Sequence, residues 1–158
     1  MSHDLSAFPL PAGMSAAEYV ESDAYEAPPT GEQRAAMERA AEARLALDPS
    51  AERFEDERCI ELTAADAIQV SLYPRSAGIT VPCWYEDSEA DAVMERVFAY
   101  ARVLSDTLGY TVWDPQTETV VEPGTADRSA STAILGDISG RMDEIAQPAR
   151  RPWWKIRG

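Results

Sequence analysis

The stretch AIQVSLYPRSAGITVPCWYE, residues 67–86, alternates between apolar and polar side chains with a period of two. Apolar residues take every second position on one face of each half: Ile68, Val70 and Leu72, then Ile79, Val81 and Cys83. Such alternation is typical of half-buried strands. A short, glycine-containing turn from Pro74 to Gly78 separates the two halves, so the stretch predicts an antiparallel hairpin. Pro82 cannot donate a ladder hydrogen bond, which predicts a sheet edge or a bulge there.

A long amphipathic helix is predicted directly after the hairpin. Ser88 and Asp91 have the spacing and the acidic first turn of a helix start. Apolar residues then recur at helical intervals: Ala90, Val93, Met94, Val97, Phe98, Ala101, Leu104 and Leu108. Gly109 is placed to end the helix as a C-cap. The apolar stripe predicts that this helix lies across the hairpin.

Other elements surround this centre. Thr30 and Gln33 have capping-box spacing and predict a helix that ends at Asp48-Pro49. Its small apolar stripe comprises Ala36, Ala40, Ala43 and Leu47, and Met37, Ala41 and Leu45 flank this stripe. Residues 51–59 are charged and indicate a connection, whereas CIELTA (59–64), YTVWDPQ (110–116) and TETVVEP (117–123) indicate short strands. Residues 125–148 indicate a weaker helix.

The predicted fold class is therefore α+β: a small antiparallel sheet with a long amphipathic helix packed on it and further helices at both ends. The proline pairs of FPLPAG and EAPPT indicate that residues 1–29 form an N-terminal arm, with a helical turn at Ser15 to Glu18. Residues 30–147 form a single α+β domain. Residues 148–158 form a basic, tryptophan-rich C-terminal tail.

The charge of the chain excludes some classes of partner. Its 158 residues have a formal net charge of −14. Nucleic-acid binding needs clustered Lys and Arg, so it is not expected. An acidic surface instead attracts cations or basic proteins, or serves solubility alone. The N-terminal residues lack a basic, apolar leader, and no apolar run reaches the length of a membrane span. These features predict a cytoplasmic protein without stable membrane association.

The sequence offers few residues for catalysis or for metal binding. Its one histidine, His3, falls in the predicted arm, so no Ser-His-Asp or Cys-His arrangement is expected. Cys59 and Cys83 lack a metal-site spacing, and their strand phases place them on opposite faces, which predicts two free thiols. A carboxylate pair such as Asp114 and Glu118 is the remaining basis for an enzyme. We expect neither an enzyme nor a cofactor nor a metal.

Aromatic residues gather on or beside the predicted sheet. Tyr73 and Trp84 fall on the face opposite the apolar stripe and are cross-strand neighbours if the hairpin pairs simply. Two readings are open: a second core layer under a terminal helix, or a binding face with aromatic anchors among carboxylates. The candidate partner-binding surface comprises Trp84, Tyr85, Glu86, Asp87, Glu89, Asp91, Trp113 and Asp114.

The C-terminal tail contrasts with the acidic body. It contains Arg150, Arg151, Trp153, Trp154 and Lys155 and no acidic residue. Three roles are open. It can fold back on the acidic body, where tethering raises its effective concentration. It can lie at a lipid interface, or it can dock on a partner.

The central motifs also resemble those of known proteins. ITVPCWYE (79–86), the amphipathic helix and GYTVWDPQ (109–116) resemble small bacterial proteins with ITVPYW-like and TVYDPQ-like stretches. Those are similar to acidic single-domain immunity proteins, the partners of bacterial toxins. The resemblance spans residues 60–116, and Cys83 stands where an aromatic residue is expected. It implies an immunity-type protein that neutralises a basic toxin by covering its active cleft.

Two other functions are weighed against this one. The first is a non-enzymatic interaction or scaffold protein that docks through its basic-aromatic tail. The second is an enzyme whose site uses carboxylates alone. Loss of a partner on removal of the tail would indicate the first, and saturable binding of a small metabolite would indicate the second.

Overall fold

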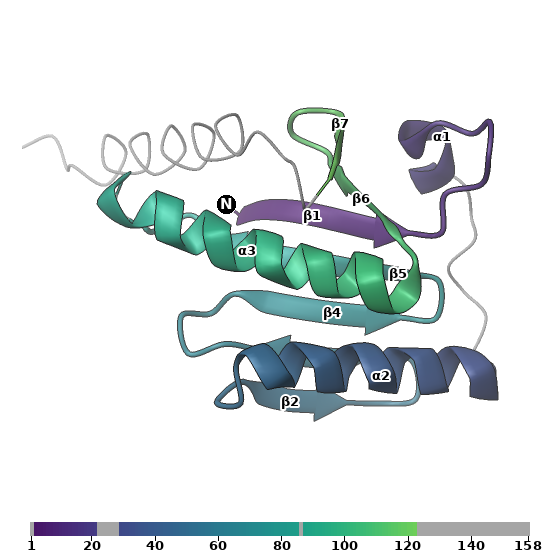
Figure 1. Ribbon diagram of the computed structural model, residues 1–158, viewed down its shortest axis with the longest axis horizontal. Coiled ribbons are helices and arrows are strands. Elements are labelled where there is room, and N and C mark those ends of the chain that lie inside the picture. The colour runs from purple at the N-terminus through teal and green to yellow at the C-terminus, as the bar shows by residue number, and fades with distance from the viewer. Residues whose placement is uncertain (1, 22–28, 86, 123–158) are drawn as a thin grey trace, which may run out of the picture.

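A computed structural model describes residues 2–21, 29–85 and 87–122 of the chain. These residues form a seven-stranded sheet with the strand order β2-β3-β4-β5-β1-β6-β7, and every neighbouring pair is antiparallel. Helices accompany the sheet (Figure 1), so the α+β architecture is confirmed. The sheet is larger than the small one predicted.

The elements have the following bounds. The strands are β1 (Ser2–Phe8), β2 (Glu52–Glu55), β3 (Ile60–Thr63), β4 (Gln69–Tyr73), β5 (Ser76–Pro82), β6 (Thr111–Asp114) and β7 (Thr119–Val121). The helices are α1 (Ala16–Val20), α2 (Gly31–Leu47) and α3 (Asp87–Leu108).

The hairpin of residues 67–86 is confirmed as β4 and β5, but its turn is shorter than predicted. Tyr73 pairs with Ser76, which leaves two residues in the turn instead of five. Trp84 then falls beyond the far end of β5, so its predicted cross-strand contact with Tyr73 is wrong. Pro82 is not at a sheet edge either, because β5 lies between β4 and β1. Its missing N–H is tolerated because pairing with β4 ends at Thr80.

The N-terminal segment corrects the predicted arm. Ser2–Phe8 is β1, which lies inside the sheet and pairs with both β5 and β6. Its sequence, SHDLSAF, has the period-two pattern of a half-buried strand, and the prolines that indicated an arm follow it. The capping box of Ser15 and Glu18 is present and starts α1. Tyr19 of α1 stacks on Phe8 with ring centroids 4.6 Å apart, so this segment belongs to the domain.

Helices α2 and α3 lie side by side on one face of the sheet (Figure 1). Helix α3 is 22 residues long and ends at Leu108. Gly109, which follows it, has a φ of 68° and so suits the predicted glycine C-cap. The predicted apolar stripe of α3 is buried from Ala90 to Leu104 and, together with Tyr100, forms the core with the inner faces of the strands. Helix α3 packs on β5 of the hairpin and on the neighbouring strands β1 and β6.

Helix α2 begins with the predicted capping box of Thr30 and Gln33 and ends at Leu47, with Asp48 as its C-cap. The face that it buries differs from the predicted one. Its buried residues are Met37, Ala40, Ala41 and Arg44, whereas Leu47 is exposed. The buried face is rotated towards Met37 and Ala41, and Arg44 is buried against Tyr100 of α3.

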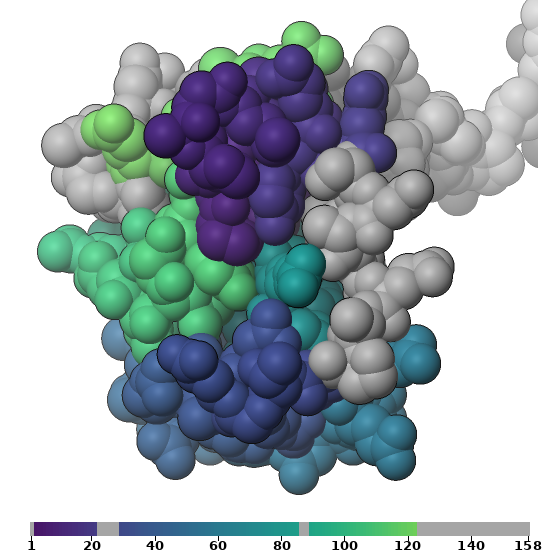
Figure 2. Space-filling model, turned by 90° about the vertical axis from the view of Figure 1, so that its right-hand side faces the viewer, coloured from purple at the N-terminus to yellow at the C-terminus, as the bar shows by residue number. Residues whose placement is uncertain are grey.

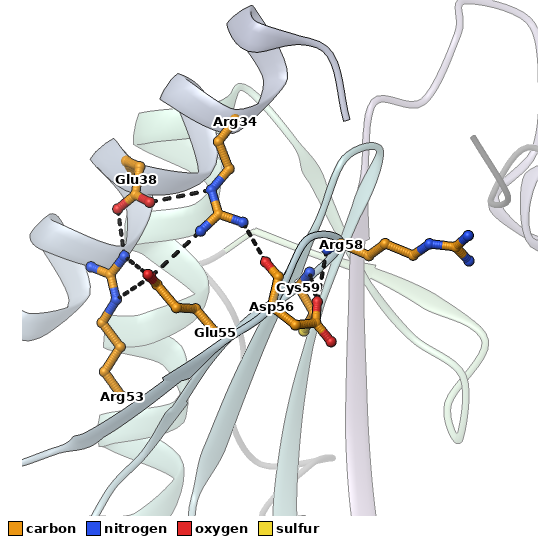
Figure 3. A network of polar contacts seen from close by, with 7 residues as sticks. All are labelled: Arg34, Glu38, Arg53, Glu55, Asp56, Arg58 and Cys59. Carbon is orange, nitrogen blue, oxygen red and sulfur yellow. Dashed lines mark hydrogen bonds and ion pairs between the residues drawn. The ribbon is translucent and has the colours of Figure 1, made fainter. Parts of the chain in front are cut away.

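Residues 51–59 are not only a connection, because they include the edge strand β2. Ion pairs fasten this edge to α2 (Figure 3). Arg53 Nη2 lies 2.6 Å from Glu38 Oε2, and Arg34 Nη1 donates to the Asp56 carbonyl oxygen at 2.8 Å. Charged side chains of this kind protect an edge strand from pairing with other chains.

The opposite face of the sheet, called the second face below, is only partly covered by described helices. Helix α1 packs there on Phe8 and Trp113, at one end of β1. Figure 2 shows this end of the molecule, with α1 in purple above, the end of α3 in green and α2 in blue below. The predicted helix in 125–148 and the tail lie outside the described residues.

Candidate functional site

Trp84 is the centre of the candidate site. Its side chain is 69% exposed, the largest fraction among the exposed large apolar residues of the described chain. The residues on either side, Cys83 and Tyr85, are both buried. The alternation of β5 therefore continues past its last residue and turns the indole outward. An exposed tryptophan on a fixed backbone is the kind of residue that anchors protein interfaces.

Tyr85 was predicted to lie on the partner-binding surface, but it lies beneath that surface. It is 7% exposed, and its hydroxyl donates a hydrogen bond to the backbone oxygen of Asp66 in the β3–β4 loop. Burial, reinforced by the nearby negative charge of Asp66, raises the pKa of Tyr85 to about 12. Tyr85 thus stays neutral and ties the segment that carries Trp84 to a loop of the sheet.

The Asp66 loop is held in turn by α3. The Asp66 carboxylate forms an ion pair with Arg96, and within the loop the Ala67 N–H donates to the Ala64 carbonyl oxygen at 2.8 Å. Tyr85, Asp66 and Arg96 therefore make a chain of contacts from the base of Trp84 to the middle of α3. The Trp84 and Tyr85 ring centroids are 6.3 Å apart with a tilt of 44°. This arrangement restricts the segment before α3 and favours a preformed surface.

The acidic members of the surface follow on α3. Glu89 and Asp91 are exposed near the start of the helix. Glu86 lies outside the described residues, and although α3 begins at Asp87, nothing is described of that side chain. Carboxylates in the first turn suit the helix dipole, so a structural reason for them exists beside a binding role.

Two other residues of the predicted partner-binding surface, Trp113 and Asp114, lie away from Trp84. Trp113 is opposite Ser6 on the second face and packs against Phe8 and α1, far along the strands from Trp84. Asp114 is 0% exposed and cannot contribute to a surface. Its Oδ1 accepts a hydrogen bond from the Gln116 N–H at 2.8 Å, which fixes the turn between β6 and β7. Asp114 is therefore structural and Trp113 is partly buried away from Trp84. Of the predicted members whose side chains are described, Trp84, Glu89 and Asp91 are exposed.

The structure brings together a buried group that the sequence analysis missed. His3 is 0% exposed on β1, and its Nε2 lies 3.6 Å from Asp114 Oδ2. Burial lowers the pKa of His3, although the nearby Asp114 and Asp4 charges oppose this shift. Neither ring nitrogen makes a hydrogen bond in the described structure. The period-two pattern of SHDLSAF was the signal that could have placed His3 inside the sheet.

The His3 environment does not form a nucleophilic site. Cys83 accepts a hydrogen bond from the backbone of His3 and not from its ring. Burial raises the pKa of both Cys83 and Cys59, so neither thiol is activated. Both cysteines are free, as predicted. Among residues 2–21, 29–85 and 87–122, no group of three metal-binding side chains comes together.

An open groove of about 540 Å³ lies between the end of α3 and strands β6 and β7. Tyr110, Val112 and Val121 give it an apolar side, and Arg102 and Asp106 give it a polar one. Those two charges form an ion pair with Arg102 Nε 3.5 Å from Asp106 Oδ2. None of the predicted site residues lines this groove.

Comparison of the chain with protein-family models, with curated proteins and with solved structures finds no match. The described helices also include none that is long and apolar enough to cross a membrane. The site must therefore be interpreted from its own geometry.

Proposed function

We propose that this chain is an acidic protein-binding domain of the immunity type, which neutralises a basic bacterial toxin by covering its active cleft. The observation that carries the proposal is Trp84, 69% exposed on a segment that Tyr85 and Asp66 hold in place. Exposed tryptophans that are already ordered contribute strongly to binding, because little conformational entropy is lost when the partner docks.

Charge supports the same function. The chain carries a net charge of −14, and Glu89 and Asp91 lie exposed near Trp84 in the sequence. Carboxylates steer a basic partner towards the surface and repel acidic competitors. An active cleft that binds phosphates or other anions is itself basic, so a surface of this kind is complementary to it. Trp84 supplies contact area, and the carboxylates raise the association rate and the selectivity for a basic partner.

The test is capture of a partner by the full chain from its native host, followed by surface variants. We expect one basic protein to be captured and its activity to be inhibited. Reversing two charges with Glu89→Lys and Asp91→Lys should slow association at least tenfold at low salt. The matched control, Glu32→Lys with Glu42→Lys on α2, changes the net charge equally and should retain most of the association rate.

Two outcomes separate this function from the alternatives. Equal loss of association in both double variants would mean that net charge, and not the Trp84 surface, recruits the partner. A chain that ends at Gln147 tests the tail. If the shortened chain folds but captures nothing, the tail is the docking element, and the function is that of a scaffold protein.

A further inference from the structure

The register of the sheet aligns one row of residues across all seven strands on the second face. Its two ends are apolar and exposed: Phe54 on β2 is 61% exposed and Val120 on β7 is 52% exposed. Its centre is small, with Ser71 opposite Gly78 and Gly78 opposite Ser6. Ser71 on β4, Gly78 on β5 and Ser6 on β1 thus form a row of small residues, called the band below, and larger residues lie on either side of it.

The band is accessible at its middle. An added Cβ atom at Gly78 would meet, among described atoms within 4 Å, the Leu5 carbonyl oxygen at 3.9 Å. Nothing described therefore packs down on Gly78 from above. The band continues along β5 through Ser76 and Thr80, which are also half-buried and small. At the other end of β5 the band stops at Pro82, which is buried, and Trp84 lies beyond the end of the strand.

The charge of this face has one sign. Its charged strand residues in the described chain are Asp4, Glu52 and Glu61, all acidic, since Arg53 points to the α2 side. A second copy of this chain would bring like charges together, which is unfavourable. The complementary occupant is a basic one.

The dimensions of the band fit a helix. Neighbouring strands are about 4.8 Å apart, so β4 and β1 are separated by about 10 Å, with β5 between them. An α-helix with its side chains is about 10–12 Å across. A helix laid along β5 would cover β4 and β1, with Asp4 of β1 against one side and Glu61 of β3 near the other. Phe54 is on β2, about 14 Å from β5, and lies outside the width of such a helix.

We propose that the second face binds a basic amphipathic helix of a protein partner, laid along β5 between Glu61 and Asp4. This rests on the proposed function in one respect, since the same toxin would supply the helix. A bound helix would cover the middle of the second face, where nothing described packs on Gly78. It also accounts for the small residues at the three central strands, since larger ones would hold a helix away from the backbone.

The proposal can be tested without the natural partner. The probe is a synthetic amphipathic helix of about 18 residues, built from leucine and lysine, and its control is a shuffled peptide of identical composition. Each is added to the isotope-labelled full chain, and binding is mapped by amide NMR shifts. We expect the helical peptide to shift Ser6, Ser71, Gly78 and Thr80, and the shuffled peptide to bind at least tenfold more weakly.

Blocking the band gives a second measurement. Ser71→Arg places a long cationic side chain in the middle of the band. Ala99→Arg adds the same side chain to the exposed side of α3, on the opposite face of the sheet. We expect Ser71→Arg to weaken peptide binding about tenfold and Ala99→Arg to change it less than about twofold. The NMR spectrum of each variant reports whether it is folded, and Thr80→Arg replaces Ser71→Arg if that variant is not.

Three results would overturn the proposal: equal binding of both peptides, shifts confined to α2 and α3, or equal weakening by both variants. Binding at the band only in a chain that ends at Gln147 would also overturn it, because the tail would then be the occupant. The test is separable from the proposed function. Peptide binding at the band without capture of a toxin would support the band as a helix-binding site and contradict the immunity function. Capture of a toxin without peptide binding would support the immunity function and contradict the band as a helix-binding site.

Discussion

The guanidinium carbon of Arg44 lies 3.5 Å from the centroid of the Tyr100 ring, so α2 and α3 meet through a cation–π contact inside the core. Arg44 is 1% exposed, and its ion-pair partner is Asp48, with 3.6 Å between Nη2 and Oδ2. Its three side-chain nitrogens make no hydrogen bond in the described structure. Burying such a cation costs desolvation free energy that one long ion pair offsets only in part.

Replacing Arg44 with an apolar side chain should therefore not weaken the fold. We expect Arg44→Met to be neutral or to raise the free energy of unfolding by about 1–4 kcal/mol, because methionine fills similar space without a charge. Asp48→Asn should lower it, since the buried cation then loses its partner. Urea unfolding measures both.

The control for Arg44 is Arg102→Met, an exposed arginine of α3 whose loss should change the free energy of unfolding by less than about 0.5 kcal/mol. A loss above about 2 kcal/mol in Arg44→Met would contradict this account. It would mean that the cation–π contact with Tyr100 outweighs the desolvation cost.

The regularity with which apolar residues recur along the sequence explains which parts of the fold could be predicted. The β4–β5 hairpin and α3 have long, regular apolar patterns that a single pairing satisfies, and both are present. β1 was missed because its seven residues end just before Pro9 and Pro11, which outweighed the pattern. The burial of Arg44 could not be predicted, because spacing alone does not say which side of α2 faces α3.

The candidate site was predicted in part, for a similar reason. Trp84 was placed on the outer face by its strand phase, and it is exposed. Tyr85 and Asp114 were added to the same surface although each adjoins a tryptophan in a strand-like segment. Adjacent residues of a strand point to opposite faces, so Trp84 with Tyr85, or Trp113 with Asp114, cannot both face a partner. That rule was available from the sequence.

His3 should make the stability of the fold depend on pH. Burial lowers the pKa of His3 in the folded state, whereas an unfolded chain has a histidine pKa of about 6.5. As the pH falls below about 6.5, the unfolded chain takes up a proton that the folded one does not, so the free energy of unfolding decreases. A single histidine changes the free energy of unfolding by at most about 1.4 kcal/mol per pH unit.

The measurement is urea unfolding at several values between pH 7.5 and pH 5.5, where most carboxylates stay ionised. His3→Gln should flatten this dependence, whatever its effect at pH 7.5. The slope of stability against pH is compared, so a general loss of stability does not obscure the result. An unchanged slope in His3→Gln would assign the pH dependence to other groups.

The network at the sheet edge should contribute modestly and in a salt-dependent way. Glu38 and Arg53 are partly exposed, with 2.6 Å between Glu38 Oε2 and Arg53 Nη2. A double-mutant cycle with Glu38→Ala and Arg53→Ala should give a coupling free energy of about 0.5–1 kcal/mol. It should fall in 1 M salt, because salt screens exposed charges. A coupling that is unchanged by salt would indicate packing instead.

Tyr85 should stabilise the surface without belonging to it. Tyr85→Phe removes the hydroxyl that donates to Asp66 and leaves the backbone oxygen of this half-buried residue without that donor. We expect a loss of about 1 kcal/mol in the free energy of unfolding. Ultraviolet titration of the folded chain should also lose one tyrosine that ionises near pH 12. If Tyr85→Phe instead loses a tyrosine that ionises near pH 10, the buried position of Tyr85 is contradicted.

Trp84 provides the sharpest separation between binding and folding. Its side chain is 69% exposed, so Trp84→Ala should change the free energy of unfolding by less than about 0.5 kcal/mol. An interface anchor of this size contributes about 2 kcal/mol or more, so partner affinity should fall at least about thirtyfold. Trp113→Ala is the matched control, because Trp113 packs against Phe8 and α1. It should lower stability and leave the affinity of the folded fraction largely intact. If the two variants exchanged these effects, the partner would dock over α1, and the function assigned to Trp84 would be wrong.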